Sequence, residues 1–270
     1  MGVLNTTPDS FSDGGDLLVD GCLSLDKVLP RCAQMLAEGA VIIDVGGEST
    51  RPGATPISVQ QELDRVIPAV AAIAARFDTI ISVDTSSAEV ITAAAAVGAG
   101  LINDVRALER SGALKAAAAT GLPVCLMHMQ GRPQTMQLAP SYSDVVENVS
   151  AYLLDRVRCC KEAGFDGSQL LLDPGFGFGK SAEHNLSLLN RLPQLRALGY
   201  PLLVGLSRKS IIGRVLGREV EDRLAGSLSL AVLAVDRGAT IIRAHDIQQT
   251  VDAVAMAAAV LAESAPEALN

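Results

Sequence analysis

The sequence is poor in aromatic residues and in positive charge. Tryptophan is absent, aromatic residues make up 3% of the 270 residues, and the formal net charge is −8. A nucleic-acid-binding surface needs basic patches and aromatic rings on which bases stack. The composition therefore argues against a nucleic-acid partner, and it implies that any anionic ligand is bound by a few local cations.

The sequence also lacks an apolar stretch that is long enough to span a bilayer. The longest uncharged apolar stretches, Val90–Ile102 and Ala253–Ala262, are shorter than the about 20 residues that a transmembrane helix needs. No basic segment followed by an apolar one opens the chain, because Pro8, Asp9 and Asp13 come at once. We therefore expect a cytoplasmic protein without a membrane partner.

Cysteine and histidine are scarce and are not spaced as metal ligands. The five cysteines include no C-x-x-C pair, and the three histidines lie far apart in the sequence. The adjacent Cys159 and Cys160 cannot easily form a disulfide with each other. We expect reduced and mostly buried thiols.

What the sequence does contain is a series of eight short apolar runs, each followed by a residue that can form hydrogen bonds, carry charge or bind a cation. These residues are Asn5, Asp44, Asp84, Asn103, His128, Asp173, Ser207 and Arg243. The runs start about one β/α unit apart, which is the pattern of strands that alternate with crossover helices. The pattern predicts an α/β fold, a (β/α)8 TIM barrel, whose catalytic groups lie at the C-terminal ends of its strands. A chain of 270 residues matches one barrel, so we expect a single domain over residues 1–270.

Four pairs of residues have the spacing of a capping box and place helix starts after the strand-end loops. They are Ser58 with Gln61, Ser86 with Glu89, Asp144 with Glu147 and Asp246 with Gln249. Pro68 falls inside the helix expected over 59–77, which predicts a kink or a break there. Two long loops, 6–20 and 48–58, follow strands at the catalytic end, where such loops often close over a substrate.

Asp84, Asn103 and Asp173 are expected to project into one mouth of the barrel. Two carboxylates and an amide suit the edge of a flat heterocycle that presents several N–H donors. A buried carboxylate such as Asp173 would be costly to keep ionised without such a partner. The alternative is that these carboxylates pair with Lys209 or Arg243 and simply neutralise the mouth.

Arg51, Arg243 and His245 form a second group, which is cationic or able to become so. Together with Asn5 they could hold a phosphate or diphosphate, with the Asn5 oxygen as a ligand for Mg²⁺. The alternatives are a solvated loop charge for Arg51 and a helix-start residue bonded to the backbone for His245.

The glycine-rich stretch 173–181 looks at first like a nucleotide-binding P-loop, but Pro174 stands where that motif requires glycine. Its glycines allow the backbone to approach a ligand closely, and Phe176 and Phe178 offer apolar faces for a planar ring. The alternative is a flexible turn with two core aromatics. Further on, Lys209 and Ser210 end the seventh run and suit a carboxylate, although a Schiff-base role for Lys209 is also possible.

Eight motifs, in this order and over nearly the whole chain, resemble the dihydropteroate synthase family of the folate pathway. They are MGVLNTTPDSFSDGG (1–15), IDVGGESTRPGA (43–54), SVDT (82–85), IND (102–104), MHMQG (127–131), DPGFGFGK (173–180), GLSRKS (205–210) and RAHD (243–246).

The resemblance implies a reaction in which 6-hydroxymethyl-7,8-dihydropterin diphosphate and 4-aminobenzoate give 7,8-dihydropteroate and diphosphate, with Mg²⁺ as cofactor. The pterin would contact Asp84, Asn103, Val105, Met127, Asp173, Phe178 and Lys209. Diphosphate would contact Asn5, Arg51, Arg243 and His245, with Mg²⁺ on Asn5. Aminobenzoate would contact Thr50, Pro52, Phe176, Lys209 and Ser210. The catalytic set would be Asp84, Asp173, Lys209, Arg243 and His245.

The implied mechanism is departure of diphosphate, which leaves a cation on the pterin methylene, followed by attack of the aniline nitrogen. It requires two separate clusters, one for the leaving anion and one for the electron-poor ring. The resemblance also implies a homodimer and competitive inhibition by sulfonamides. Family members usually carry a hairpin ahead of the first strand, so we expect that hairpin to be truncated or absent here.

Three other functions are compatible with parts of the pattern. The first is the pterin-binding barrel of a corrinoid-linked methyltransferase, which does not need the STRPG loop or the SRKS turn. The second is an aldolase that uses Lys209 as a Schiff base. The third is a non-catalytic pterin-binding paralogue, which would be expected to lose Arg51, Lys209 or Arg243.

Overall fold

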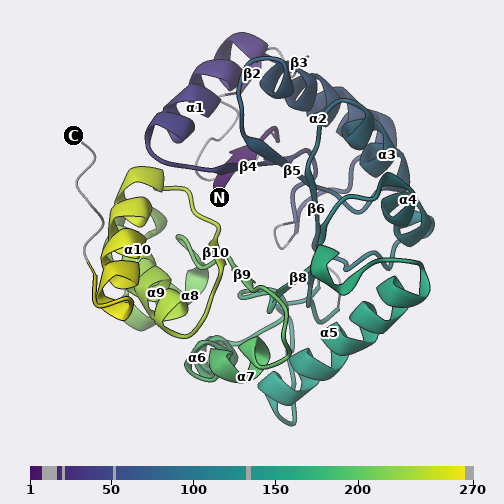
Figure 1. The fold of residues 1–270 in the computed structure, drawn as a ribbon. Coiled ribbons are helices and arrows are strands. Elements are labelled where there is room, and N and C mark those ends of the chain that lie inside the picture. Colours follow the sequence, from purple (N-terminus) through teal and green to yellow (C-terminus); the bar gives the residue numbers. More distant parts are fainter. Residues whose placement is uncertain (8–16, 20–21, 51–52, 132–134, 265–270) are drawn as a thin grey trace.

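Eight parallel strands form a ring that is surrounded by helices (Figure 1). The computed structural model describes residues 1–7, 17–19, 22–50, 53–131 and 135–264. The barrel strands are β1 (Gly2–Asn5), β4 (Ile42–Gly46), β5 (Ile80–Asp84), β6 (Leu101–Asp104), β7 (Val124–Met127), β8 (Leu170–Asp173), β9 (Leu203–Val204) and β10 (Ile241–Ile242). A short antiparallel pair, β2 (Leu18–Val19) and β3 (Cys22–Leu23), follows the first strand.

The ring closes through two single bridges. Six strands pair in the order β1-β4-β5-β6-β7-β8, and β9 pairs with β10. Bridges between Leu172 and Leu202 and between Gly2 and Ala244 join these two sheets, and Ala244 N–H donates to the Met1 carbonyl at 3.0 Å. The predicted TIM barrel is therefore confirmed. Because all eight strands are parallel, their C-terminal ends meet on one rim.

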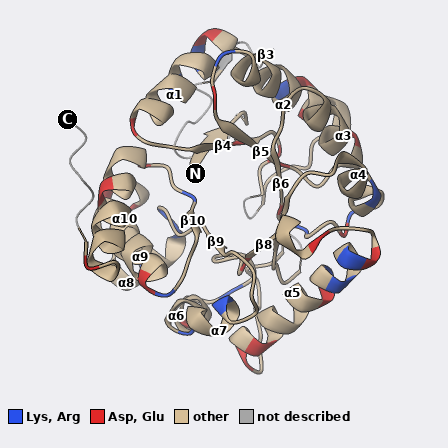
Figure 2. Cartoon of the chain, in the orientation of Figure 1, with Lys and Arg blue, Asp and Glu red and all other residues tan. Residues whose placement is uncertain are grey.

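The helices bury one face against the strands and cover the outside of the barrel. They are α1 (Leu25–Ala37), α2 (Val59–Ala74), α3 (Ala88–Ala96), α4 (Ala113–Thr120), α5 (Val145–Glu162), α6 (Ala182–Asn190), α7 (Leu192–Arg196), α8 (Ser210–Leu216), α9 (Leu224–Asp236) and α10 (Ile247–Leu261). Acidic and basic residues are dense on α5, whereas α9 and α10 are almost free of charge (Figure 2). Among the described residues, no helix combines the length and the apolar character that a membrane span needs.

The predicted helix starts are only partly confirmed. Ser58 and Gln61 form a complete capping box, with Gln61 N–H to Ser58 Oγ at 3.2 Å and Ser58 N–H to Gln61 Oε1 at 2.9 Å. Asp144 caps α5 by accepting from two backbone N–H groups. The other two pairs mark helix starts without forming capping boxes. Asp246 is the N-cap residue of α10, and α3 begins two residues after Ser86, but the Ser86 and Asp246 side chains bind groups outside these helices.

Pro68 does not break its helix, since α2 runs from Val59 to Ala74 as one element. All five cysteines are free, and Cys32, Cys125 and Cys160 are buried, as the sequence indicated.

Candidate active site

Polar side chains from four neighbouring or nearby strands converge at the C-terminal rim. Asp84 on β5 is the register partner of Asn103 on β6, and Asp173 ends β8. The buried Cys125 thiol lies among them: its pKa is raised by burial, and further by Asp173, Asp44 and Asp84. The predicted convergence of Asp84, Asn103 and Asp173 is therefore present in the structure.

Asp44 belongs to this group, although the sequence analysis gave it no role beyond ending a strand. Its side chain is fully buried on β4, and Asn103 donates its amide N–H to the two carboxylate oxygens at 3.4 and 3.2 Å. The signal was available, because Asp44 follows the second apolar run in the same way as Asp84 follows the third.

Arg243 joins the two predicted clusters instead of belonging to only one. Its Nε donates to Asp44 Oδ2 at 2.6 Å and its Nη2 donates to Asp84 Oδ2 at 3.2 Å. Barrel closure explains this contact, because it places the strand before Arg243 next to β1, and β4 and β5 follow in the ring. The expected separation of the cation cluster from the pterin cluster is wrong, because Arg243 contacts Asp84 directly. The pairing of Asp84 with Arg243, which the alternative predicted, is present in the structure.

The carboxylates at the rim are shifted toward their neutral forms. Burial, together with the nearby Asp44 carboxylate, raises the pKa of Asp84, and Arg243 opposes this shift. Burial also raises the pKa of Asp173, which Lys209 and a hydrogen bond of 2.7 Å from Gly175 N–H counteract. A ligand with N–H donors would favour the ionised carboxylates, so the electrostatics of the rim suit such a ligand.

The glycine-rich loop lies between β8 and α6 and faces Lys209. The Lys209 ammonium donates to the Phe176 carbonyl and lies 4.8 Å from the centre of the Phe178 ring. Burial lowers the pKa of Lys209 to about 8. The Phe176 ring is 1% exposed and belongs to the core, so the alternative of a core aromatic holds for it, while Phe178 is only half-buried.

The buried Lys180 holds this loop in place through hydrogen bonds to its backbone. The sequence analysis gave Lys180 no role. Its buried ammonium donates to the carbonyls of Gly175 at 2.8 Å and Phe178 at 3.1 Å, and it lies 2.9 Å from His128 Nδ1. Burial lowers the pKa of Lys180 to about 7 and that of His128 to about 3. Gly175 has a φ of +70°, and a Cβ there would lie 1.8 Å from the His128 carbonyl oxygen, so only glycine fits.

His245 is neutral at pH 7, although the sequence grouped it with residues that are cationic or able to become so. Burial and the neighbouring Arg243 lower its pKa to about 4. Ser207 Oγ lies 3.0 Å from His245 Nδ1 and accepts the His245 backbone N–H at 3.2 Å. At neutral pH the imidazole can therefore offer one N–H to an anion, but no positive charge.

The turn before α8 is tied to the loop that carries His245. Arg208 adopts a φ of +56° and donates from Nε at 2.9 Å and Nη2 at 2.5 Å to the two oxygens of Asp246. This bidentate pair fixes Ser207 and Lys209, which flank Arg208, relative to His245.

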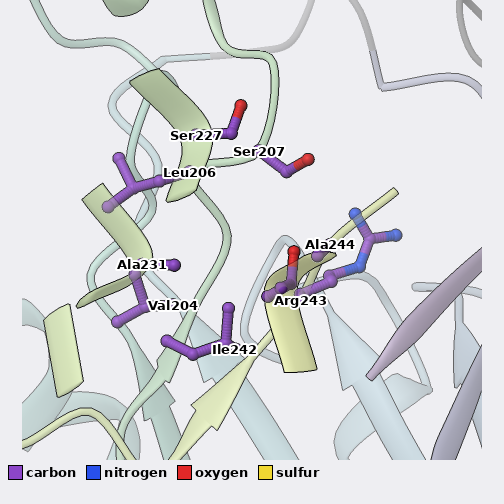
Figure 3. A pocket seen from close by; sticks show the side chains of 9 residues that line it. Val204, Leu206, Ser207, Ser227, Ala231, Ile242, Arg243 and Ala244 are labelled. Carbon is purple, nitrogen blue, oxygen red and sulfur yellow. The ribbon is translucent and has the colours of Figure 1, made fainter. Parts of the chain in front are cut away.

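A small pocket behind Ser207 and Arg243 is not a ligand site. Figure 3 shows that apolar side chains of Val204, Leu206 and Ile242 line it and that the Arg243 guanidinium points away from them. This pocket lies between β9, β10 and α9, beneath the rim.

The remaining predicted residues are distributed around the rim. Val105 and Met127 are buried, Asn5 and Thr50 are half-buried, and Ser210 is exposed at the first position of α8. Arg51 and Pro52 lie outside the described residues.

A metal ion could find only a sparse set of protein ligands here. Among the residues that the structure describes, no three His, Cys, Asp or Glu side chains are grouped so that they could hold a metal ion. Asn5 ends β1 beside Gly46 and offers one amide oxygen. Mg²⁺ usually keeps water and phosphate oxygens as most of its ligands. Asn5 alone would leave most of the coordination sphere of a Mg²⁺ to water and to phosphate oxygens of a ligand.

Comparisons with known proteins agree with a barrel of this kind. Residues 1–245 match the family described as pterin binding enzyme, so fold and rim together define a pterin-binding barrel enzyme. Dihydropteroate synthase of Escherichia coli (strain K12) is 56% identical over 261 residues, which are 97% of this chain and 91% of the relative.

Solved structures give the same result. A dihydropteroate synthase of Yersinia pestis, in complex with a sulfonamide drug, superposes with a TM-score of 0.94 at 52% identity and covers 97% of this chain and 94% of that chain. A dihydropteroate synthase of Xanthomonas albilineans with 4-aminobenzoic acid has a TM-score of 0.89 at 48% identity, covering 98% and 93%. The chain belongs to the dihydropteroate synthase family, and it is a transferase of folate biosynthesis.

Proposed function

We propose that this enzyme condenses 6-hydroxymethyl-7,8-dihydropterin diphosphate with 4-aminobenzoate, releasing diphosphate and forming 7,8-dihydropteroate. The observation that carries the proposal is the convergence of Asp84, Asn103 and Asp173 with Lys209 and Arg243 on one rim. The homologous structures with 4-aminobenzoic acid and with a sulfonamide drug support the choice of the second substrate and of sulfonamides as competitive inhibitors.

In this proposal the pterin lies across the buried acceptors. Asp84, Asn103 and Asp173 bind its N–H edge, and burial makes each of these hydrogen bonds stronger than it would be in water. Val105 and Met127 pack beneath the ring, and Phe178 and the Lys209 stem cover it.

Diphosphate would lie next to the pterin, on the side of the rim that carries Arg243. Arg243 uses two of its five N–H donors on Asp44 and Asp84, which leaves the others for phosphate oxygens. Neutral His245 would donate one further hydrogen bond, and Asn5 and Arg51 would complete the set. Mg²⁺, when bound beside Asn5, supplies positive charge that stabilises the departing diphosphate.

The chemical step needs no protein nucleophile. Diphosphate departs first with the electrons of the C–O bond, and the ionised carboxylates stabilise the cation that remains on the pterin methylene. The aniline nitrogen then forms the C–N bond and releases one proton to water. Thr50, Pro52, Lys209 and Ser210 would hold aminobenzoate, with its carboxylate near the Lys209 ammonium. A Schiff-base role for Lys209 is not favoured, because its ammonium is engaged by Phe176 and lies beside Asp173.

The test is an assay of diphosphate release with each substrate supplied alone and with both together. We expect release that requires pterin diphosphate and aminobenzoate, together with formation of dihydropteroate, and a loss of rate when Mg²⁺ is omitted. Diphosphate release without dihydropteroate would show that the second substrate is different. Reductive trapping of Lys209 by a carbonyl substrate would favour the aldolase instead.

We further propose a homodimer that functions in the cytoplasm. Large apolar side chains are exposed on α8, α9 and α10, among them Met256 at 66% and Val260 at 70%. An apolar face of this kind is typical of an interface between subunits. The cytoplasm is proposed because the cysteines are free, as they are in a reducing compartment.

A further inference from the structure

A chain of four polar side chains links three successive strand-end loops next to the mouth. Ser86, after β5, donates its hydroxyl to Asp104, at the end of β6. Arg106 donates from Nη1 to Ser86 Oγ at 2.9 Å. The same guanidinium holds both carboxylate oxygens of Glu48, through Nη1 to Oε2 at 3.0 Å and Nη2 to Oε1 at 3.3 Å. This series of hydrogen-bonded side chains therefore ends at Glu48, on the loop that follows β4.

At the other end of this hydrogen-bonded series, Asp104 is held rigidly. The Asp104 side chain is fully buried and also accepts the backbone N–H groups of Arg106 at 2.8 Å and Leu108 at 2.9 Å. Ala107 and Leu108 have positive φ values of 48° and 60°, which only a well-supported turn maintains. Asp104 thus fixes the turn from which the Arg106 side chain projects.

The Glu48 end lies at the start of the loop that carries Thr50. Glu48 is two residues beyond Gly46, which is the register partner of Asp84, and Thr50 is two residues further along. Gly47 is held as well, because its carbonyl accepts from Arg65 Nη1 at 3.1 Å. These contacts determine the point and the direction in which the loop leaves β4.

The Arg106–Glu48 ion pair is shielded from solvent well enough to hold the loop after β4 against the turn after β6. We call this ion pair the tether. The Arg106 and Glu48 side chains are 22% and 12% exposed, and the two parallel N–H···O contacts restrict both groups to one geometry. Pairs of exposed charges, by contrast, contribute little. Both Arg106 and Glu48 lie outside the set of residues proposed to touch the substrates.

We propose that Arg106 is a positioning residue that acts through Glu48 to set the loop carrying Thr50 for binding of aminobenzoate. The inference deepens the proposed function and rests on it. The pterin residues Asp84, Asn103 and Asp173 are held by their strands, so they do not depend on this tether. The tether should therefore affect the second substrate and leave the first almost unchanged.

The test measures KM separately for 4-aminobenzoate and for pterin diphosphate in Glu48→Gln, Arg106→Gln and the double variant. We expect each single change to raise KM for 4-aminobenzoate by about tenfold, the range for loss of a charge-assisted bidentate contact, and to change KM for pterin diphosphate by less than about twofold. The double variant should be no worse than the poorer single variant, because both changes remove the same contact. Arg106→Lys should be intermediate, since an ammonium cannot span both Glu48 oxygens.

A matched control is Arg191→Gln. Arg191 pairs with Asp144 at 2.6 Å, and the two side chains are 32% and 29% exposed, but this pair joins the helix segments around α5 and α7. Its loss should lower the thermal midpoint without changing either KM.

Several results would overturn the positioning role. They are an unchanged KM for 4-aminobenzoate in Glu48→Gln, equal increases of both KM values, or additive effects in the double variant. If Arg106→Gln does not fold, Glu48→Gln and Arg106→Lys still decide the question, because both retain the partners of Asp104. Failure of the proposed function itself is seen separately, as an absence of dihydropteroate with the unmodified enzyme.

Discussion

Arg243 is held by two carboxylates from different strands, and this arrangement sets the electrostatics of the rim. Asp44 is fully buried and accepts from Arg243 Nε and from Asn103, so it is the more firmly paired of the two. Asp84 receives the longer contact, from Nη2, and remains 16% exposed. Asp84 is therefore the carboxylate that can respond to a ligand, while Asp44 holds Arg243 in place.

The first prediction concerns Asp84→Asn. We expect kcat to fall by about 100-fold, in the range seen when one group that stabilises developing charge is lost. Stability should change little, because burial already disfavours the charged form of Asp84 and Asp44 still pairs with Arg243. Steady-state kinetics and thermal unfolding measure the two quantities, with the exposed Asp236→Asn on α9 as control. A variant that forms dihydropteroate at the wild-type rate would refute the role of Asp84.

At the scale of the element, the loop between β8 and α6 is organised by one buried amine. The Lys180 side chain donates hydrogen bonds to two carbonyls of the loop, and the Tyr142 hydroxyl donates to a third, that of Gly179, at 2.7 Å. His128, which Lys180 contacts, packs edge-on against Tyr152 of α5. The loop that presents Phe178 to the mouth thus depends on groups that lie beneath it.

The second prediction is a pH-dependent effect of Lys180→Met. The folded protein holds the pKa of Lys180 at about 7, below its ordinary value of 10.5. Between these values the unfolded chain binds the proton and the folded chain does not, so the free energy of unfolding from this group increases with pH by up to ~1.4 kcal/mol per pH unit.

Lys180→Met removes this pH-dependent contribution to the free energy of unfolding. It also removes hydrogen bonds whose loss costs about 1–3 kcal/mol. Urea unfolding at pH 7 and pH 9 should therefore show a larger deficit for the variant at pH 9. The exposed Lys115→Met on α4 is the control, with the same small change at both values. A deficit that is equal at both pH values would contradict the buried, deprotonating amine.

On the scale of the whole molecule, the helices around the barrel are not equivalent. The helix α5 carries many charged residues, which is typical of a surface in contact with water (Figure 2). By contrast, α9 and α10 pack on each other and still expose apolar side chains. The structure shows Val251, Met256 and Val260 at the surface.

The third prediction is that Met256→Glu together with Val260→Glu produces a monomer. Two carboxylates in an apolar interface would be buried without partners, which is strongly unfavourable. Sedimentation velocity should show a dimer for the wild type and a monomer for the variant, while Leu154→Glu on α5 leaves the dimer intact. A wild-type monomer, or a variant that remains dimeric, would exclude this face as the interface.

The order of strands and the residues at their ends were determined by the sequence alone. Alternating runs require parallel strands, parallel strands end on one rim, and so Asn5, Asp84, Asn103, Asp173 and Arg243 had to lie near one another. This logic is local and periodic, and it needs no knowledge of side-chain directions. The motifs within those runs were sufficient to indicate the family.

Only the tertiary structure decided which of these groups pair. The contact of Arg243 with Asp44 spans the closure of the barrel, and the neutral state of His245 depends on burial and on Arg243. Lys180 and Arg106 act on loops through partners distant in sequence, His128 and Glu48. Distances, burial and the resulting pKa shifts arise from how the eight strands close and tilt together, and no pattern along the chain encodes them directly.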